Sequence, residues 1–196
     1  MLKRFPILVL FLALHGGASA GADPRSTVMG FYAWRLTDGS TGAPTEREAA
    51  VIRPFVTPEL ACLLTLSRRY QQAFWKRYRA AGPPYEKPPY VDGDFYSSSF
   101  EVPWRGLIED VTVNGSTASV RLRFSHEPDA GGTDWHDQVE LRLVGQEWLI
   151  SDFRRTAGFE FGNAGSLIEG FHGVMSKDVP EVGWRGRWAR GCRPNP

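Results

Sequence analysis

The sequence predicts an α+β domain in which N-terminal helices pack on an antiparallel sheet and a C-terminal extension follows. Two observations predict this class. Apolar residues recur at spacings of three and four up to Gly82, and they alternate with polar residues from Leu107 onward. Helices that precede a run of strands joined by short turns are typical of a domain with its helices on one face of the sheet.

The first 20 residues are typical of a secretory signal peptide. Lys3 and Arg4 form a positive start, residues 5–14 are an apolar run, and a small-residue pattern ends at Ala20. We therefore expect cleavage between Ala20 and Gly21, and a mature protein that is periplasmic or secreted. The apolar run is shorter than the roughly 20 residues of a transmembrane helix. We expect no transmembrane segment in the mature chain; an uncut N-terminal anchor is the alternative.

Three helices are predicted from capping residues at their starts. Asp23 precedes Pro24, and Thr57 precedes Pro58, so each pair places a proline in the first turn after an N-cap. Thr45 starts a capping box, and this helix has to end before the proline at position 54. The predicted helices begin at residues 24, 46 and 58, and the third ends at Gly82.

Four strands are predicted from alternating apolar residues. Asn114-Gly115 is a strong signal for a hairpin turn between the first two strands. After the last strand the pattern is weaker, with a short edge strand at 159–161 and a helix from Ser166 to Met175. The four strands are expected at 107–113, 118–124, 139–143 and 148–153.

The charge balance and the absence of known motifs limit the function classes. Residues 21–196 carry 21 basic and 22 acidic side chains. A dedicated nucleic-acid binder would show a large basic excess, so we expect no nucleic-acid partner. The sequence contains no phosphate-cradling loop, dinucleotide fingerprint or paired-histidine zinc motif, so we predict no cofactor and no metal.

Two cysteines, Cys62 and Cys192, are most simply interpreted as one disulfide in an exported protein. The bridge would close a loop of about 130 residues and stabilise the fold by about 4–5 kcal/mol in the chain-entropy model. Two unpaired thiols are the alternative.

Two segments carry a resemblance to known families. Residues 146–153 read QEWLISDF, which resembles the last-strand pattern of the nuclear transport factor 2-like (cystatin-like cone) superfamily. Residues 90–98 read YVDGDFYSS, which resembles a segment in a family of small exported bacterial proteins of unknown function. The resemblance implies a cone-shaped α+β domain with a bent sheet over residues 21–155. Residues 156–196 go beyond the usual cone, and we expect them to be an extension packed on or tethered to this domain. The superfamily contains isomerases, dehydratases and binding proteins, so the fold does not specify the function.

The Asp92-Gly93-Asp94 motif, beside Tyr90, is the first candidate for ligand or partner binding. Two carboxylates around a glycine are able to bind a hard cation or to place an acid beside a base. The alternative is a turn in which the aspartates cap backbone amides and Phe95 enters the core.

A second candidate is catalytic and consists of His126, Asp137 and Asp152. Strand alternation places His126 in phase with Phe124, Asp137 in phase with Val139, and Asp152 in phase with Trp148 and Ile150. All three would then point inward near strand ends, where a histidine and a carboxylate are able to do acid–base work. The alternative is that the strand ends are irregular and these side chains are solvated.

The tail is the third candidate. Trp184, Arg185, Arg187 and Trp188 alternate aromatic and basic side chains, which suits an anionic partner. The alternative is that the tryptophans fold back on the domain and Cys192 fastens them to the long helix.

The leading interpretation is an exported, non-catalytic binding domain. Its partner would be a protein or small molecule of the cell envelope, and one specific form is an immunity-type protein that neutralises a periplasmic toxin. The alternative is a lyase- or isomerase-like enzyme that uses His126 with Asp137 or Asp152 on a small ligand. The oligomeric state is not encoded in any recognisable pattern.

Overall fold

The computed structural model describes residues 23–84, 86–126, 134–159 and 163–193, so the predicted signal peptide lies outside it. The α+β class is confirmed: helices come first and pack against an open antiparallel sheet in the order β1-β2-β3-β4-β5. None of the helices in these ranges is long and apolar enough to cross a membrane. The helices are α1 Pro24–Asp38, α2 Glu46–Ile52, η1 Arg53–Phe55, α3 Pro58–Ala81, α4 Leu167–Met175, η3 Pro180–Val182 and α5 Arg187–Arg190; the strands are β1 Arg105–Asn114, β2 Thr117–Ser125, β3 Trp135–Val144, β4 Glu147–Arg155 and β5 Gly165–Ser166.

The three predicted helix starts are confirmed. Asp23 Oδ1 accepts a hydrogen bond from the Ser26 amide at 3.0 Å at the start of α1. Thr45 and Glu48 form the capping box of α2, and Thr57 Oγ1 accepts from the Leu60 amide at the start of α3. These side chains satisfy amides that have no partner within the first helical turn.

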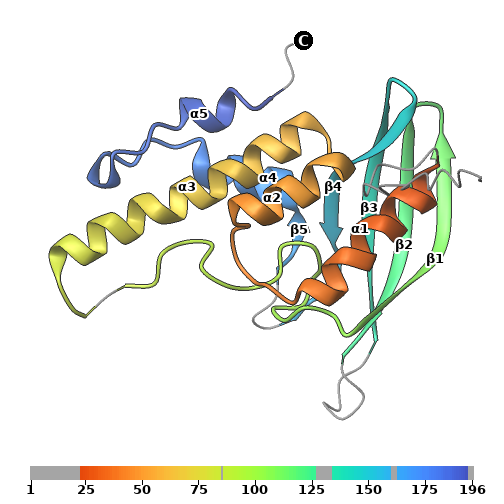
Figure 1. Ribbon diagram of the computed structural model, residues 1–196, viewed down its shortest axis with the longest axis horizontal. Helices are drawn as coiled ribbons and strands as arrows, with labels where there is room; N and C mark the ends of the chain where they lie inside the picture. Colours follow the sequence, from red (N-terminus) through yellow and green to blue (C-terminus); the bar gives the residue numbers. More distant parts are fainter. Residues whose placement is uncertain (1–22, 85, 127–133, 160–162, 194–196) are drawn as a thin grey trace, which may run out of the picture.

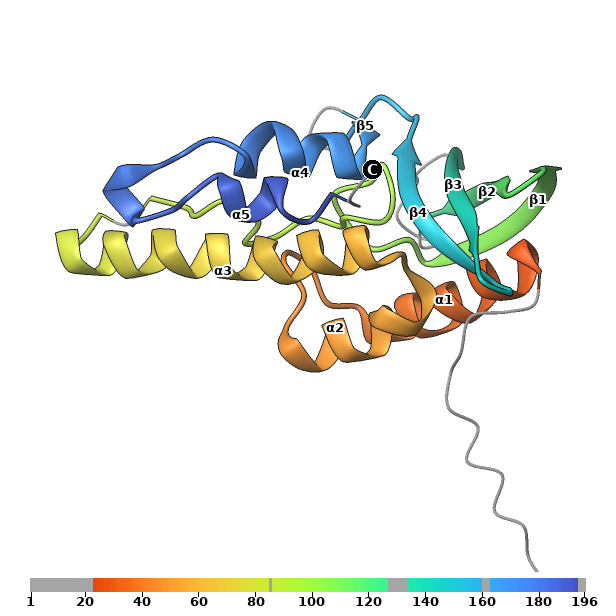
Figure 2. The same cartoon turned by 90° about the horizontal axis from the view of Figure 1, so that it is seen from above.

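The helices form two groups around the sheet (Figures 1 and 2). Helix α1 lies across one face of the sheet and contacts β1, β2 and β4. Helix α3 extends beyond the sheet, with α4 and α5 lying alongside it. The core between α1 and the sheet is aromatic: the ring of Phe31 lies 5.2 Å from the rings of both Tyr96 and Phe153, measured between centroids.

A β-bulge in β4 places Asp152 on the opposite face of the sheet from the one predicted. The register of β3 and β4 shifts between Glu140 and Leu141, so that Leu141 pairs with Ile150 while Glu140 pairs with Asp152. One extra residue, Ser151, reverses the two-residue alternation of side chains. Asp152 therefore lies on the face opposite to Ile150, toward α4, and the prediction that it points inward with Trp148 and Ile150 is wrong.

The chain after β4 differs in part from the prediction. Residues 160–162 lie outside the described residues, so the predicted strand at 159–161 is not tested beyond Phe159, which belongs to no strand. The fifth strand is Gly165–Ser166, which pairs with the end of β4. The predicted helix from Ser166 is confirmed, with Ser166 Oγ accepting from the Glu169 amide at 3.0 Å.

Candidate functional site

His126 and Asp137 both contact one tryptophan at the same end of the sheet. The ring centroids of His126 and Trp135 are 4.6 Å apart, and Trp135 Nε1 donates a hydrogen bond to Asp137 Oδ2 at 3.1 Å. In the described part of the chain, no hydrogen bond or ion pair joins His126 to Asp137 or Asp152. The structure thus places His126 and Asp137 near a shared neighbour, without the direct bond that orients an acid–base pair.

Four donors hold the buried carboxylate of Asp137. The amides of Ser98 and Thr156 donate at 2.7 Å and 2.8 Å, and the Ser98 hydroxyl and the Trp135 indole supply the other two bonds. These bonds join the irregular segment before β1 to the ends of β3 and β4. Sequence reasoning missed Ser98. The pattern that could have indicated it is the run of three serines, 97–99, inside an aromatic segment.

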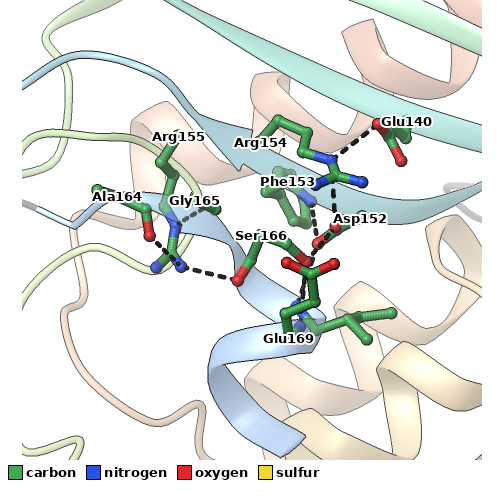
Figure 3. Close-up of polar contacts among 10 residues, drawn as sticks. Glu140, Asp152, Phe153, Arg154, Arg155, Ala164, Gly165, Ser166 and Glu169 are labelled. Atoms are coloured by element: carbon green, nitrogen blue, oxygen red, sulfur yellow. Dashed lines mark hydrogen bonds and ion pairs between the residues drawn. The ribbon is translucent and has the colours of Figure 1, made fainter. Parts of the chain in front are cut away.

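Asp152 fastens α4 to β4 (Figure 3). Its Oδ1 accepts from the amides of Phe153 at 2.9 Å and Ile168 at 3.1 Å, and its Oδ2 accepts from the Ser166 hydroxyl. The Ile168 amide belongs to the first turn of α4, where a negative charge is favourable. Arg154 lies 3.7 Å from Asp152 and donates to Glu140 at 2.9 Å. Asp152 therefore acts as a cap for a helix that is distant in sequence from its own strand.

Arg155 is a buried arginine that the sequence did not single out. Figure 3 shows its guanidinium directed at the backbone of residues 164–166, which contain β5. Nε donates to the carbonyl of Gly165 at 3.1 Å, and Nη2 donates to those of Ala164 and Ser166 at 3.3 Å and 3.2 Å. Burial lowers the pKa of Arg155 from its usual value. Its role is to hold β5 against β4.

The two carboxylates of the Asp92-Gly93-Asp94 motif separate in the structure. Asp94 is fully buried and accepts from Arg35 Nε at 3.1 Å and Nη2 at 2.9 Å, whereas Asp92 pairs with the exposed Lys87. Asp94 also accepts from the Tyr96 amide at 3.2 Å, as the turn interpretation expects. Across the described ranges, no three histidine, cysteine, aspartate or glutamate side chains converge on a metal position.

Arg35, the partner of Asp94, was missed by sequence reasoning. It follows Phe31 by four residues and Tyr32 by three on α1, so it lies on the apolar stripe that faces the core. An arginine on such a stripe indicates a buried partner, but helical spacing alone does not say which carboxylate it meets.

Tyr90 lies at a junction of helices and is largely buried. Its carbonyl accepts from Gln71 Nε2 at 2.6 Å and from the Ala43 amide at 2.8 Å, and its ring packs edge-on against Phe171. Burial raises the pKa of its phenol well above the usual value. The backbone φ of 61° is in the left-handed region, which non-glycine residues seldom adopt.

The C-terminal tail folds back on α3. Trp184 is buried, its indole N–H donates to the carbonyl of Met175 at 2.8 Å, and its ring lies 4.8 Å from that of Tyr70. The structure contains the predicted Cys62–Cys192 disulfide, which joins residues 130 positions apart. The tail is thus fastened to α3 by packing and by a covalent bond.

A groove remains open between α3 and this tail, with a volume of about 700 Å³. Trp188, at its rim, stays 43% exposed although its ring contacts Trp184 edge-on at 5.0 Å. A second hollow of about 530 Å³, which is also lined by residues of η1 and β4, shares Cys62, Leu66 and Arg69 with the first. We call the first hollow the α3–tail groove; its lining residues are Cys62, Leu66, Arg69, Ala73, Gly183, Trp184, Arg187, Trp188 and Gly191.

Comparison with known proteins gives two partial likenesses. No protein-family model and no curated protein sequence matches the chain, so the resemblance to the nuclear transport factor 2-like superfamily stays a prediction. A SEC-C motif-containing protein from Rhodopseudomonas palustris is 15% identical over 69% of this chain and 80% of its own, with a TM-score of 0.38. A chain of the type VI effector–immunity complex Tae3–Tai3 from Ralstonia pickettii is 17% identical over 71% of this chain and 100% of its own, with a TM-score of 0.41.

Proposed function

We propose that this chain is an exported, non-catalytic binding domain whose partner is a protein of the cell envelope. In its specific form it is an immunity-type protein that neutralises a periplasmic toxin. The observation that carries the proposal is the α3–tail groove, an open hollow with an exposed tryptophan and two arginines in its lining. Tryptophan and arginine are the residue types that most often dominate the binding energy of protein interfaces.

The internal carboxylates favour binding over acid–base catalysis. Asp137 accepts from four donors, and Asp152 accepts from three, all of them within the fold. A general base needs a free position within hydrogen-bond reach of its substrate. Both carboxylates instead use their oxygens to join separate segments of the chain.

The disulfide supports a location in the cell envelope. Structural disulfides form and persist in oxidising compartments, which include the bacterial periplasm. The Cys62–Cys192 bond agrees with the predicted export of residues 21–196.

The test uses the oxidised 21–196 protein as bait for periplasmic extract. The expected result is a protein that co-elutes with it as one complex in size-exclusion chromatography. Production of that partner in the periplasm should stop growth, and co-production of this chain with its leader should restore it. Growth that stops equally in both strains would contradict the immunity form, and failure to form any complex would contradict the binding function.

A further inference from the structure

The charges of residues 21–196 are unevenly distributed. Residues 57–82, which contain α3, and residues 177–193, which form the tail, together carry ten basic and three acidic side chains. The remainder of residues 21–196 carries 11 basic and 19 acidic side chains. The two basic segments are far apart in sequence, and the fold brings them side by side through the disulfide and the contacts of α3 with α5 (Figures 1 and 2).

The basic side chains on these segments lack internal counter-charges. In the described ranges, none of the ten forms an ion pair with a carboxylate. Some arginines elsewhere are paired: Arg121 and Arg123 on β2 both lie 3.6 Å from Glu109. Uncompensated charge of one sign raises the potential over a surface and attracts partners of the opposite sign.

Some of these basic side chains lie along the α3–tail groove. Arg69 lines it from α3, and Arg187 lines it from the tail. Lys76 and Arg77 continue the helical stripe that contains Arg69 and Ala73, at spacings of three and four. The apolar hollow is therefore bordered by basic side chains along both of its walls.

We propose that the α3–tail groove docks an acidic protein surface, with an apolar side chain of the partner inserted beside Trp188 and carboxylates of the partner on Arg69 and Arg187. This inference rests on the proposed binding function and names the chemistry of the partner. Eight of the ten basic side chains are arginines. The planar guanidinium binds carboxylates through two parallel hydrogen bonds, and arginine is enriched at protein interfaces where lysine is depleted.

The shape of the surface favours a protein over an anionic membrane. The groove is a hollow of about 700 Å³ that admits a side chain, and Trp184 in its wall is buried against Tyr70. A lipid surface is instead met by aromatic and basic side chains that project from one face of a helix.

The experiment places a photocrosslinking amino acid in the groove of the oxidised full chain in cells. Trp188→p-benzoylphenylalanine should give an adduct with one acidic protein, and Val113→p-benzoylphenylalanine on exposed β1 should not. The crosslinked protein is then purified and titrated against the chain. The Arg69→Glu/Arg187→Glu variant should bind at least about tenfold more weakly and associate more slowly than the parent. Added salt should reduce the association rate of the parent more than that of the variant. Arg69 and Arg187 are exposed, so the variant should keep the parent's thermal unfolding midpoint.

The matched control is Arg121→Glu/Arg123→Glu, which changes the net charge by the same amount but on the sheet. It should leave affinity within about twofold of the parent, because these arginines already pair with Glu109. If the complex forms but only the sheet variant weakens it, the assignment of the groove as the docking site is overturned and the binding function stands. Adducts at position 188 with lipid or cell-wall material, or charge-dependent binding to phosphatidylglycerol vesicles without a protein adduct, would overturn the acidic protein partner.

Discussion

At the scale of single residues, the most consequential contact is the buried pair of Arg35 and Asp94. The side chains are 1% and 0% exposed, and Arg35 Nη2 lies 2.9 Å from Asp94 Oδ1. Asp94→Asn should lower the free energy of unfolding by about 3–5 kcal/mol, because it leaves the arginine charge buried without its partner. Urea unfolding followed by circular dichroism measures the loss.

Two variants separate this effect from general damage to the motif. Asp92→Asn changes the neighbouring carboxylate, whose partner Lys87 is exposed, and should cost less than about 1 kcal/mol. Arg35→Met combined with Asp94→Asn should recover much of the lost stability, because no charge remains buried. Equal losses for Asp92→Asn and Asp94→Asn would contradict the assignment.

At the scale of elements, the disulfide decides whether the tail stays on α3. Replacement of both Cys62 and Cys192 by alanine should lower the free energy of unfolding by about 4–5 kcal/mol in the chain-entropy model. The tail should also loosen, because α5 is a helix of only four residues and is too short to be stable by itself. Thermal unfolding and amide hydrogen exchange of residues 184–192 measure the two effects.

A reducing agent provides the internal control for this prediction. Reductant should lower the unfolding midpoint of the parent protein and leave that of the double alanine variant unchanged. If the parent is equally stable with and without reductant, the bond contributes nothing to the fold.

The elements also show where sequence patterns succeed. Helix starts were predictable because capping is local: Asp23, Thr45 and Thr57 each bond an amide three residues away. The orientation of Asp152 was not predictable, because the bulge at Ser151 depends on how β4 pairs with β3, opposite Glu140 and Leu141. Trp184 and Trp188 look alike in sequence, and only packing against Tyr70 makes the first a core residue.

At the scale of the whole molecule, buried tyrosines predict the response to alkali. Burial raises the pKa of Tyr32, Tyr90 and Tyr96 in the folded protein. The folded state therefore keeps protons that the unfolded chain releases near pH 10, so stability is complete below about pH 10 and falls as the pH rises further. Spectrophotometric titration should show these phenols ionising only together with unfolding.

Tyr96→Phe tests the contribution of one phenol. Its hydroxyl has no hydrogen-bond partner within the described residues, so the variant should be at least as stable as the parent at neutral pH. Above about pH 10 its free energy of unfolding should fall less steeply, by about 1.4 kcal/mol per pH unit. A slope identical to the parent's would show that Tyr96 ionises in the folded protein.

The sequence by itself determined what depends on near neighbours. Periodicity specified the α+β class, capping residues specified the helix starts, and composition made a single Cys62–Cys192 bond the simplest pairing. Only the tertiary structure decided which face Asp152 lies on, that Arg35 meets Asp94, and that two basic segments become one surface. The physical reason is distance along the chain: hydrogen bonds within a turn are encoded locally, whereas a buried ion pair or a groove forms from segments that meet only after folding.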